Sequence, residues 1–144
     1  MPFHYPEVTC SERSPAESSK VEPALEFRDW CTPEFLSDLT ADSSIGAFSR
    51  YSPQAAERQL AALPKVASLP YGRVLVAHTG RRLVGFLTFH PPEADCRWAG
   101  LPAGQILELG GIEVARGLRG QGIARRLMDL AFSTTDFDAV IVFA

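Results

Sequence analysis

Apolar residues recur along the chain with two different periods, which predict a domain of mixed α and β structure. Runs rich in β-branched and aromatic residues have the pattern of strands, whereas segments with apolar residues three or four positions apart have the pattern of amphipathic helices. Strands are expected at 24–30, in the two halves of a hairpin at 73–92, at 105–115 and at 137–144, and helices at 32–39, 52–66 and 122–132. Because a helix connects the last two strands, we expect these strands to be parallel within a mixed sheet.

Residues with special backbone preferences mark the ends of several elements. Thr32 can cap the first helix, and Pro33 fits its first position. Pro64 is expected to end or kink the second helix, because proline has no amide hydrogen to donate. Gly80 suits a tight hairpin turn, and the glycine pair at 110–111 permits a bulge in the strand that it interrupts.

The chain divides into a polar N-terminal segment and one domain. Residues 1–22 are rich in Ser, Pro and Glu and show no periodicity, so we expect a disordered arm there. Residues 23–144 carry all the predicted elements, and a chain of 144 residues is long enough to bury one core.

Composition excludes several classes of partner. The net charge of −3 gives no general attraction to nucleic acid or to an anionic membrane. No apolar run reaches the roughly 18–20 residues that a membrane span needs, and the N-terminus lacks the pattern of a signal peptide. The 3 cysteines are odd in number and show no CxxC spacing, which favours a reduced protein of the cytoplasm. No ligand spacing suggests a metal site.

A glycine-rich bend at the start of the last predicted helix carries the strongest functional signal. The segment "RGQGIARR" (119–126) places bare backbone, a helix N-terminus and arginine side chains at one point, and a diphosphate is the ligand that these features fit together. A Walker loop is excluded because no Lys-Ser/Thr pair follows the glycines. A dinucleotide fingerprint fits only in part, because Arg125 stands in place of its third glycine and three strands precede the loop. The alternative is that the glycines only form a tight turn, which leaves Arg116, Arg119, Arg125 and Arg126 unexplained.

The remaining template is Arg/Gln-x-x-Gly-x-Gly/Ala after a strand, which the residues from Arg119 to Ala124 match in full. This motif and the element order resemble the GCN5-related N-acetyltransferases (GNAT), which bind acetyl-CoA. The resemblance implies that acetyl-CoA is a co-substrate, held by the backbone of the strand and by the loop that follows it. The implied binding residues are Ile112, Glu113, Val114, Arg119, Gly120, Gln121, Gly122, Ile123, Ala124 and Arg125. It further implies that the Val114 N–H polarises the thioester carbonyl.

Residues 69–123 are similar, more narrowly, to the acetoin-utilisation acetyltransferases, in stretches such as "LPYGRVLVAHTGRRLVGFLTF" and "ILELGGIEVARGLRG". Members of that family acetylate and switch off acetyl-CoA synthetase at an active-site lysine. The resemblance therefore implies a protein lysine as the acceptor. A small-molecule amine as acceptor, and a non-catalytic role as an acetyl-CoA sensor, stay open as alternatives.

Acetyl transfer to lysine requires a base, because with a pKa of about 10.4 only about one lysine in 2,500 is neutral at pH 7. Glu108 is the candidate, since it falls where histone-type members of the family place their general base. Strand alternation sets it on the face opposite Leu107 and Leu109. Glu113 on the same strand is the rival.

Other reactive side chains are less favoured. No histidine lies near Cys10, Cys31 or Cys96 in sequence, so a covalent acetyl-cysteine is not expected. His78 and His90 flank the predicted hairpin, where we expect a surface or strand-end role.

The sequence also departs from the family pattern. GNAT proteins usually continue past the fifth strand with a helix and two more strands, and the acid that protonates the leaving thiolate tends to lie in that helix. This sequence stops at Ala144, so we expect an incomplete GNAT fold in which a longer chain or a partner supplies the remainder. The oligomeric state is left open.

Overall fold

A computed structural model describes residues 23–46, 51–52, 54–133 and 141–143 of the chain. The expected disordered arm at 1–22 and the first part of the last predicted strand lie outside these residues.

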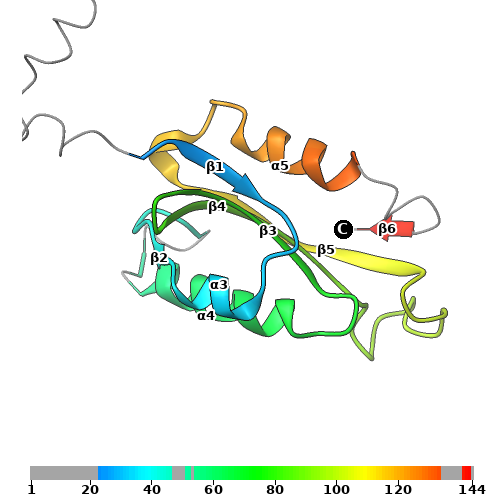
Figure 1. The fold of residues 1–144 in the computed structure, drawn as a ribbon. Helices are drawn as coiled ribbons and strands as arrows, with labels where there is room; N and C mark the ends of the chain where they lie inside the picture. Colours follow the sequence, from blue (N-terminus) through cyan, green and yellow to red (C-terminus); the bar gives the residue numbers. More distant parts are fainter. Residues whose placement is uncertain (1–22, 47–50, 53, 134–140, 144) are drawn as a thin grey trace, which may run out of the picture.

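The described strands form one curled, mixed sheet (Figure 1). The strands are β1 (Leu25–Arg28), β2 (Thr40–Ala41), β3 (Arg73–Thr79), β4 (Arg82–His90), β5 (Ile106–Val114) and β6 (Ile141–Phe143). Their order is β1-β3-β4-β5-β6, with β2 paired to the beginning of β4. The β1–β3, β3–β4 and β4–β5 pairs are antiparallel, whereas the β5–β6 pair is parallel, as the helical connection predicts.

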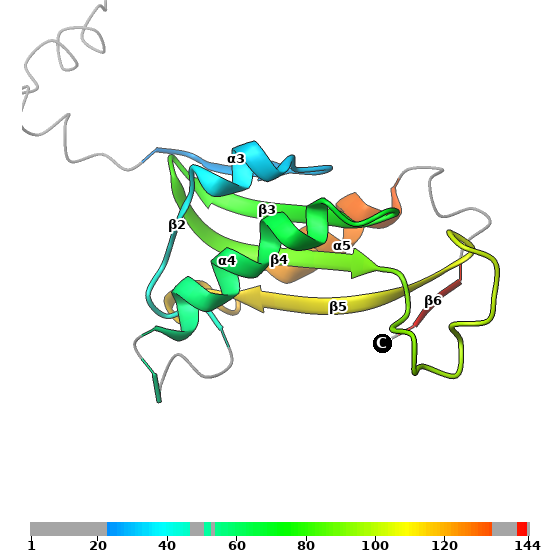
Figure 2. The ribbon, with the colours of Figure 1, turned by 90° about the horizontal axis from the view of Figure 1, so that it is seen from below.

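Helices cover both faces of this sheet. The helices are α3 (Pro33–Ser37), α4 (Ala55–Ala67) and α5 (Ile123–Phe132), with a 3₁₀ turn, η1 (Arg116–Leu118), before α5. Figures 1 and 2 show α3 and α4 together on one face and α5 alone on the other. The mixed α/β architecture expected from the sequence is therefore confirmed.

The alternation of side chains along the strands divides the core into two layers. Val74 and Val76 of β3 pack under α3 and α4, while Leu75 and Ala77 of the same strand pack under α5. All four side chains are fully buried. Because β3 and β4 are buried on both faces, their sequences read as continuous apolar runs rather than as alternating ones.

The expected end signals are present, with one correction. Thr32 caps α3 by accepting the Phe35 N–H at 3.1 Å, and Gly80 turns the β3–β4 hairpin with φ +58°. The bulge is at Gly110, because Thr88 pairs with Gly111 and Phe89 pairs with Leu109. Pro64, however, does not end α4, which continues to Ala67. The two-residue strand β2 was not expected. It forms because the Thr40 and Asp42 N–H groups donate to the carbonyls of Arg81, just before β4, and Leu83 within it.

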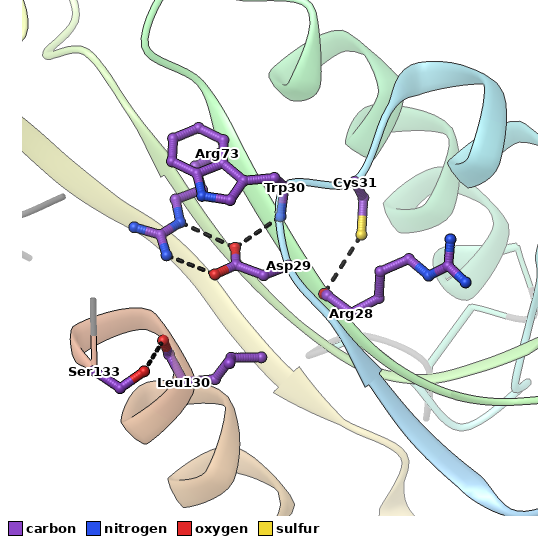
Figure 3. Close-up of polar contacts among 7 residues, drawn as sticks. All are labelled: Arg28, Asp29, Trp30, Cys31, Arg73, Leu130 and Ser133. Carbon is purple, nitrogen blue, oxygen red and sulfur yellow. Dashed lines mark hydrogen bonds and ion pairs between the residues drawn. The ribbon is translucent and has the colours of Figure 1, made fainter. Parts of the chain in front are cut away.

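A buried ion pair joins the end of β1 to the start of β3 (Figure 3). The guanidinium of Arg73, a residue only 1% exposed, donates to both carboxylate oxygens of Asp29 at 3.0 and 2.6 Å. The Trp30 ring covers the same guanidinium at 4.6 Å, and Asp29 also accepts the Trp30 N–H at 2.7 Å. Arg73 lies opposite Phe89, so the pair stands beside the end of β4.

Replacing Asp29 with alanine is expected to lower the free energy of unfolding by about 3–5 kcal/mol, because it leaves the Arg73 charge buried without its carboxylate. Denaturant unfolding followed by circular dichroism measures this loss. Asp95→Ala, in the exposed loop after β4, is the matched control and should change stability by less than about 0.5 kcal/mol. Equal stabilities of the two variants would contradict the structural role of the pair.

Candidate functional site

The glycine-rich bend forms an open loop between η1 and α5. Gly120 and Gly122 both adopt a left-handed conformation with φ +82°, which disfavours any residue with a side chain. A Cβ atom at either position would have no heavy atom within 4 Å. The backbone of this loop is therefore accessible from outside, and its glycines are required by their conformation rather than by packing.

Amide groups at the start of α5 are available to a ligand. In the first backbone hydrogen bond of the helix, the Arg126 N–H donates to the Gly122 carbonyl at 2.9 Å. Within the described residues, the amides from Gly120 to Arg125 donate to no other group of the chain, and Gly122 has no side chain with which to cap them. Unpaired N–H groups at a helix N-terminus form a binding site for anions, and the helix dipole adds to their positive potential.

The four arginines near this loop have different surroundings. Arg119 folds back and donates its Nε–H to the Val114 carbonyl at 3.2 Å. Arg126 lies over the Phe27 ring at 3.9 Å and so packs α5 against β1. Arg116 and Arg125 are exposed at the two ends of the loop. The loop therefore carries positive charge on both sides, but Arg126 also has a packing role.

The loop that follows β2 is hydrogen-bonded to η1. The Ser44 hydroxyl accepts the Arg116 N–H at 2.8 Å and donates to Asp42 at 2.7 Å, and Asp42 also pairs with Arg82 of β4. Burial opposes ionisation of Asp42, but hydrogen bonds from Ser44 and Arg82 outweigh it and lower the pKa of this carboxyl. Asp42 therefore stays charged at neutral pH and holds Ser44 in place.

The register of β5 on β4 decides which backbone groups of β5 are free. The Ala115 N–H donates to the Val84 carbonyl at 2.8 Å, and Val114 lies opposite Gly85. Hydrogen-bonded and non-hydrogen-bonded pairs alternate along an antiparallel ladder. Val114 and Ile112 therefore direct their N–H and C=O groups away from β4, whereas Glu113 directs its own toward β4.

The outward edge of β5 is open beyond the bulge, among the described residues. There, β6 pairs with β5 only at 106–108. The Val114 carbonyl on this edge is the one that accepts the Arg119 side chain. Outward-facing amides at Ile112 and Val114 thus lie on the strand that leads into the anion-binding loop, so an extended ligand could contact both.

The bulge also sets which face each side chain of β5 occupies. Leu107 before it and Val114 after it belong to the apolar layer under α5. Glu108 and Glu113 point to the opposite face and are half-buried. Each shares this face with the residue opposite it on β4. Glu108 lies opposite His90, and Glu113 lies opposite Phe86, whose ring packs under α3 and α4.

Two features of this site escaped the sequence analysis. His90 shares a face with Glu108 only because of the register of β4 on β5, for which no local sequence signal exists. Gly85 allows α5 to pack closely on the sheet, because a Cβ there would lie 3.2 Å from Ile123 Cγ2 and 3.3 Å from the Glu113 carbonyl oxygen. A glycine within an otherwise apolar strand is a signal of close approach that could have been used.

Cys31 is unsuited to nucleophilic catalysis. Its side chain is buried, and desolvation raises the pKa of its thiol to about 12, although Arg28 acts in the opposite direction. A thiol in this state does not supply the thiolate that attacks an acyl group. No group of three metal-ligating side chains occurs in the described ranges, and none of their helices is both long and apolar enough to cross a bilayer.

A separate groove of about 670 Å³ lies between α3, β2 and α4. It is lined by Leu36, Leu39, Thr40, Ala56, Leu60 and neighbouring residues. None of the predicted binding residues lines it, so the loop and the open edge of β5 form a surface site apart from this groove.

The fold, the open edge of β5 and the glycine loop before α5 define a class of protein. The model of the acetyltransferase (GNAT) family matches residues 21–134, and the chain belongs to this family.

Three known proteins show how similar its relatives are. The acetoin utilization protein AcuA of Bacillus subtilis is 28% identical over 142 residues, which cover 99% of this chain and 62% of AcuA. The crystal structure of an acetoin utilization protein from Exiguobacterium sibiricum has a TM-score of 0.70 and 26% identity, over 85% of this chain and 62% of that one. A GNAT acetyltransferase of Brucella melitensis in complex with acetyl-CoA shares the fold, with a TM-score of 0.52 and 20% identity over 76% of this chain and 67% of that one. The chain thus spans about three fifths of the length of AcuA and of the Exiguobacterium protein.

Replacing Gly122 with alanine is expected to weaken the binding of coenzyme A by about 10- to 100-fold. The left-handed conformation becomes unfavourable for alanine. A hydrogen bond from a loop N–H to the charged diphosphate, worth about 1.5–3 kcal/mol, is then misaligned. Isothermal titration calorimetry measures the dissociation constant.

Gly117→Ala is the matched control in the same segment. A Cβ at Gly117 meets no atom within 4 Å, and its φ is not positive. The control should bind coenzyme A as the wild type does. Equal dissociation constants for the two variants would remove the loop from the binding site.

Proposed function

We propose that this protein is an N-acetyltransferase that moves the acetyl group of acetyl-CoA to a lysine amine of a protein. The observation that carries this proposal is the row of amides at Gly120–Arg125, which donate to no described group of the chain and follow the outward-facing amides of Ile112 and Val114. Together they offer donors for a diphosphate and for the extended arm of one ligand. Family membership and the relative in complex with acetyl-CoA support the same ligand.

Each part of the cofactor has a counterpart in this arrangement. The diphosphate accepts hydrogen bonds from the loop amides, with Arg119 and Arg125 adding positive charge. The amide groups of the pantetheine arm pair with Ile112 and Val114 as an added strand would. The Val114 N–H then polarises the thioester carbonyl. Glu113, whose backbone pairs with β4, contributes no backbone contact to this arm.

The acceptor amine approaches the face opposite α5, where Glu108 lies. Its ammonium group must lose a proton before the nitrogen can attack, and Glu108 acts as the general base, directly or through water. The surroundings favour Glu108 over Glu113. Glu113 is opposite Phe86 beneath the helices, whereas Glu108 is opposite His90 at the end of the sheet.

The acceptor, a lysine of acetyl-CoA synthetase, is inferred from the resemblance of residues 69–123 to the acetoin-utilisation acetyltransferases. The similarity to two acetoin utilization proteins supports this resemblance. The two described cysteines, Cys31 and Cys96, are free thiols, which supports action in the reducing cytoplasm.

Incubation of acetyl-CoA synthetase with this protein and acetyl-CoA is expected to add one acetyl group, 42 Da, to its catalytic lysine, as read by peptide mass spectrometry. The Gly122→Ala variant at low acetyl-CoA should give a weaker signal. Transfer to small amines but not to this protein would change the substrate class. Saturable acetyl-CoA binding without any acetyl transfer would contradict the enzymatic function and favour a role as an acetyl-CoA sensor.

Glu108→Gln is expected to lower kcat by about 10²- to 10⁴-fold, because it removes the base while retaining the shape of the side chain. Acetyl-CoA affinity should stay unchanged, since Glu108 faces away from the α5 side of the sheet. Steady-state kinetics and calorimetry separate the two effects. Glu113→Gln is the paired variant: if it abolished turnover while Glu108→Gln did not, the base would be Glu113.

A further inference from the structure

His90, the last residue of β4, is the cross-strand partner of Glu108. Side chains of directly opposed residues share a face, with Cβ atoms about 4.5–5.5 Å apart. Both are half-buried, so they are neither locked in the core nor fully solvated. An imidazole and a carboxylate therefore stand together on the face away from α5.

The hydrogen bond of His90 fixes the chemistry of its ring. Nδ1 lies 2.7 Å from the Pro91 carbonyl oxygen. A carbonyl oxygen only accepts, so Nδ1 carries the hydrogen. In the neutral ring, Nε2 is then the nitrogen with a free lone pair, and it can take up a proton.

The position of Nε2 is set by the bulge. A Cβ built on Gly110 would lie only 2.6 Å from His90 Nε2 and 2.5 Å from Cδ2, so the imidazole occupies the space that a side chain at 110 would need. Thr88 Oγ1 would lie 3.0 Å from the same Cβ. The ring therefore lies over the bulge at Gly110, on the face that Glu108 shares.

We propose that His90 is a second catalytic residue of this site, whose Nε2 accepts the proton of the acceptor ammonium and passes it to Glu108. This proposal rests on the proposed function and assigns the route of the proton within it. It also explains why the bulge residue is a glycine, since any side chain at 110 would displace the imidazole.

In the proposed reaction, proton transfer to His90 precedes attack of the amine on the thioester. An N–H bond of the ammonium breaks and an Nε2–H bond forms, which leaves a neutral amine and an imidazolium. The amine lone pair attacks the acetyl carbonyl carbon, and the C–S bond then breaks with its electron pair on sulfur. The second proton of the amine goes to this thiolate and gives the free thiol. The imidazolium proton moves to the Glu108 carboxylate and from there to solvent.

Among the described residues, the charged groups on the elements next to this imidazole lie on β5, on β3, on α4 and in the loop after β4, where Glu93, Asp95 and Arg97 are exposed. On β5 the titratable side chains of the same face are Glu108 and Glu113. Arg73 begins the neighbouring β3, but it lies opposite Phe89 and is paired with Asp29. Lys65, in the last turn of α4, is exposed. Glu108 is the carboxylate that the strand register places directly opposite His90.

The decisive experiment compares His90→Gln with His78→Gln. His78 is a matched control, because its Nδ1 also lies 2.8 Å from a backbone carbonyl oxygen, that of Gly80, but at the far end of the same hairpin. Acetyl transfer to acetyl-CoA synthetase and to a lysine-containing peptide is measured from pH 6.5 to 10, together with acetyl-CoA affinity and the melting temperature.

His90→Gln should lower kcat by about 10²-fold at pH 7 with unchanged acetyl-CoA affinity. The deficit should shrink toward pH 10, where lysine amines lose their proton without help. A purely structural role would give a deficit independent of pH. His78→Gln should show no pH-dependent deficit.

The possible failures can be told apart. If the wild type transfers acetyl to neither acceptor, the proposed function fails and the role of His90 fails with it. If the wild type is active and His90→Gln matches it at every pH, the proposal for His90 alone is overturned. Long-range ¹H–¹⁵N NMR of the wild type adds a readout that needs no turnover: the neutral ring should carry its hydrogen on Nδ1, and a hydrogen on Nε2 would also overturn the proposal.

Discussion

The register of β5 against β4 is the constraint on which the candidate site depends. The hydrogen bond from the Ala115 N–H to the Val84 carbonyl shows the phase of the ladder. It determines which N–H and C=O groups of β5 bond to β4 and which face outward. Ile112 and Val114 fall on the outward side, and an amide that faces outward from a strand must find a partner in a ligand, in water or in another segment. The strand thus offers an edge for pairing that leads directly into the loop with its two left-handed glycines.

The sheet separates the two halves of the proposed reaction. Gly85 lets α5 approach the sheet closely through Ile123, so the N-terminus of the helix is held close to the end of β5. The anion-binding amides belong to this side. The carboxylate of Glu108 and the imidazole of His90 belong to the other face, where α3 and α4 lie (Figure 2). A thioester at the open edge of β5 would then be reached by the cofactor from one face and by an amine from the other.

The sequence predicted the elements well, because each has a strong local signal. The Thr32 cap, the turn at Gly80 and the glycines of the loop act through the backbone of a few neighbouring residues, which is readable without the fold. Pro64 does not end α4, as one of its two predicted effects required, because the helix continues for three residues beyond it. The neighbour of Glu108 could not be found, because pairing with a residue 18 positions away depends on the hairpin, the loop after it and the bulge together.

The bulge at Gly110 determines which face of the sheet each later side chain of β5 occupies. Because successive side chains point to opposite faces, one unpaired residue exchanges the faces of everything that follows it. If the same sequence paired without the bulge, Gly110 would lie opposite Thr88, Val114 would turn out of the core, and Glu113 would take its face. The Ile112 amide would then face β4. The open edge therefore exists only while the ladder prefers the bulged pairing to the regular one, a preference that a β-branched residue at 110, suited to regular strand geometry, would oppose.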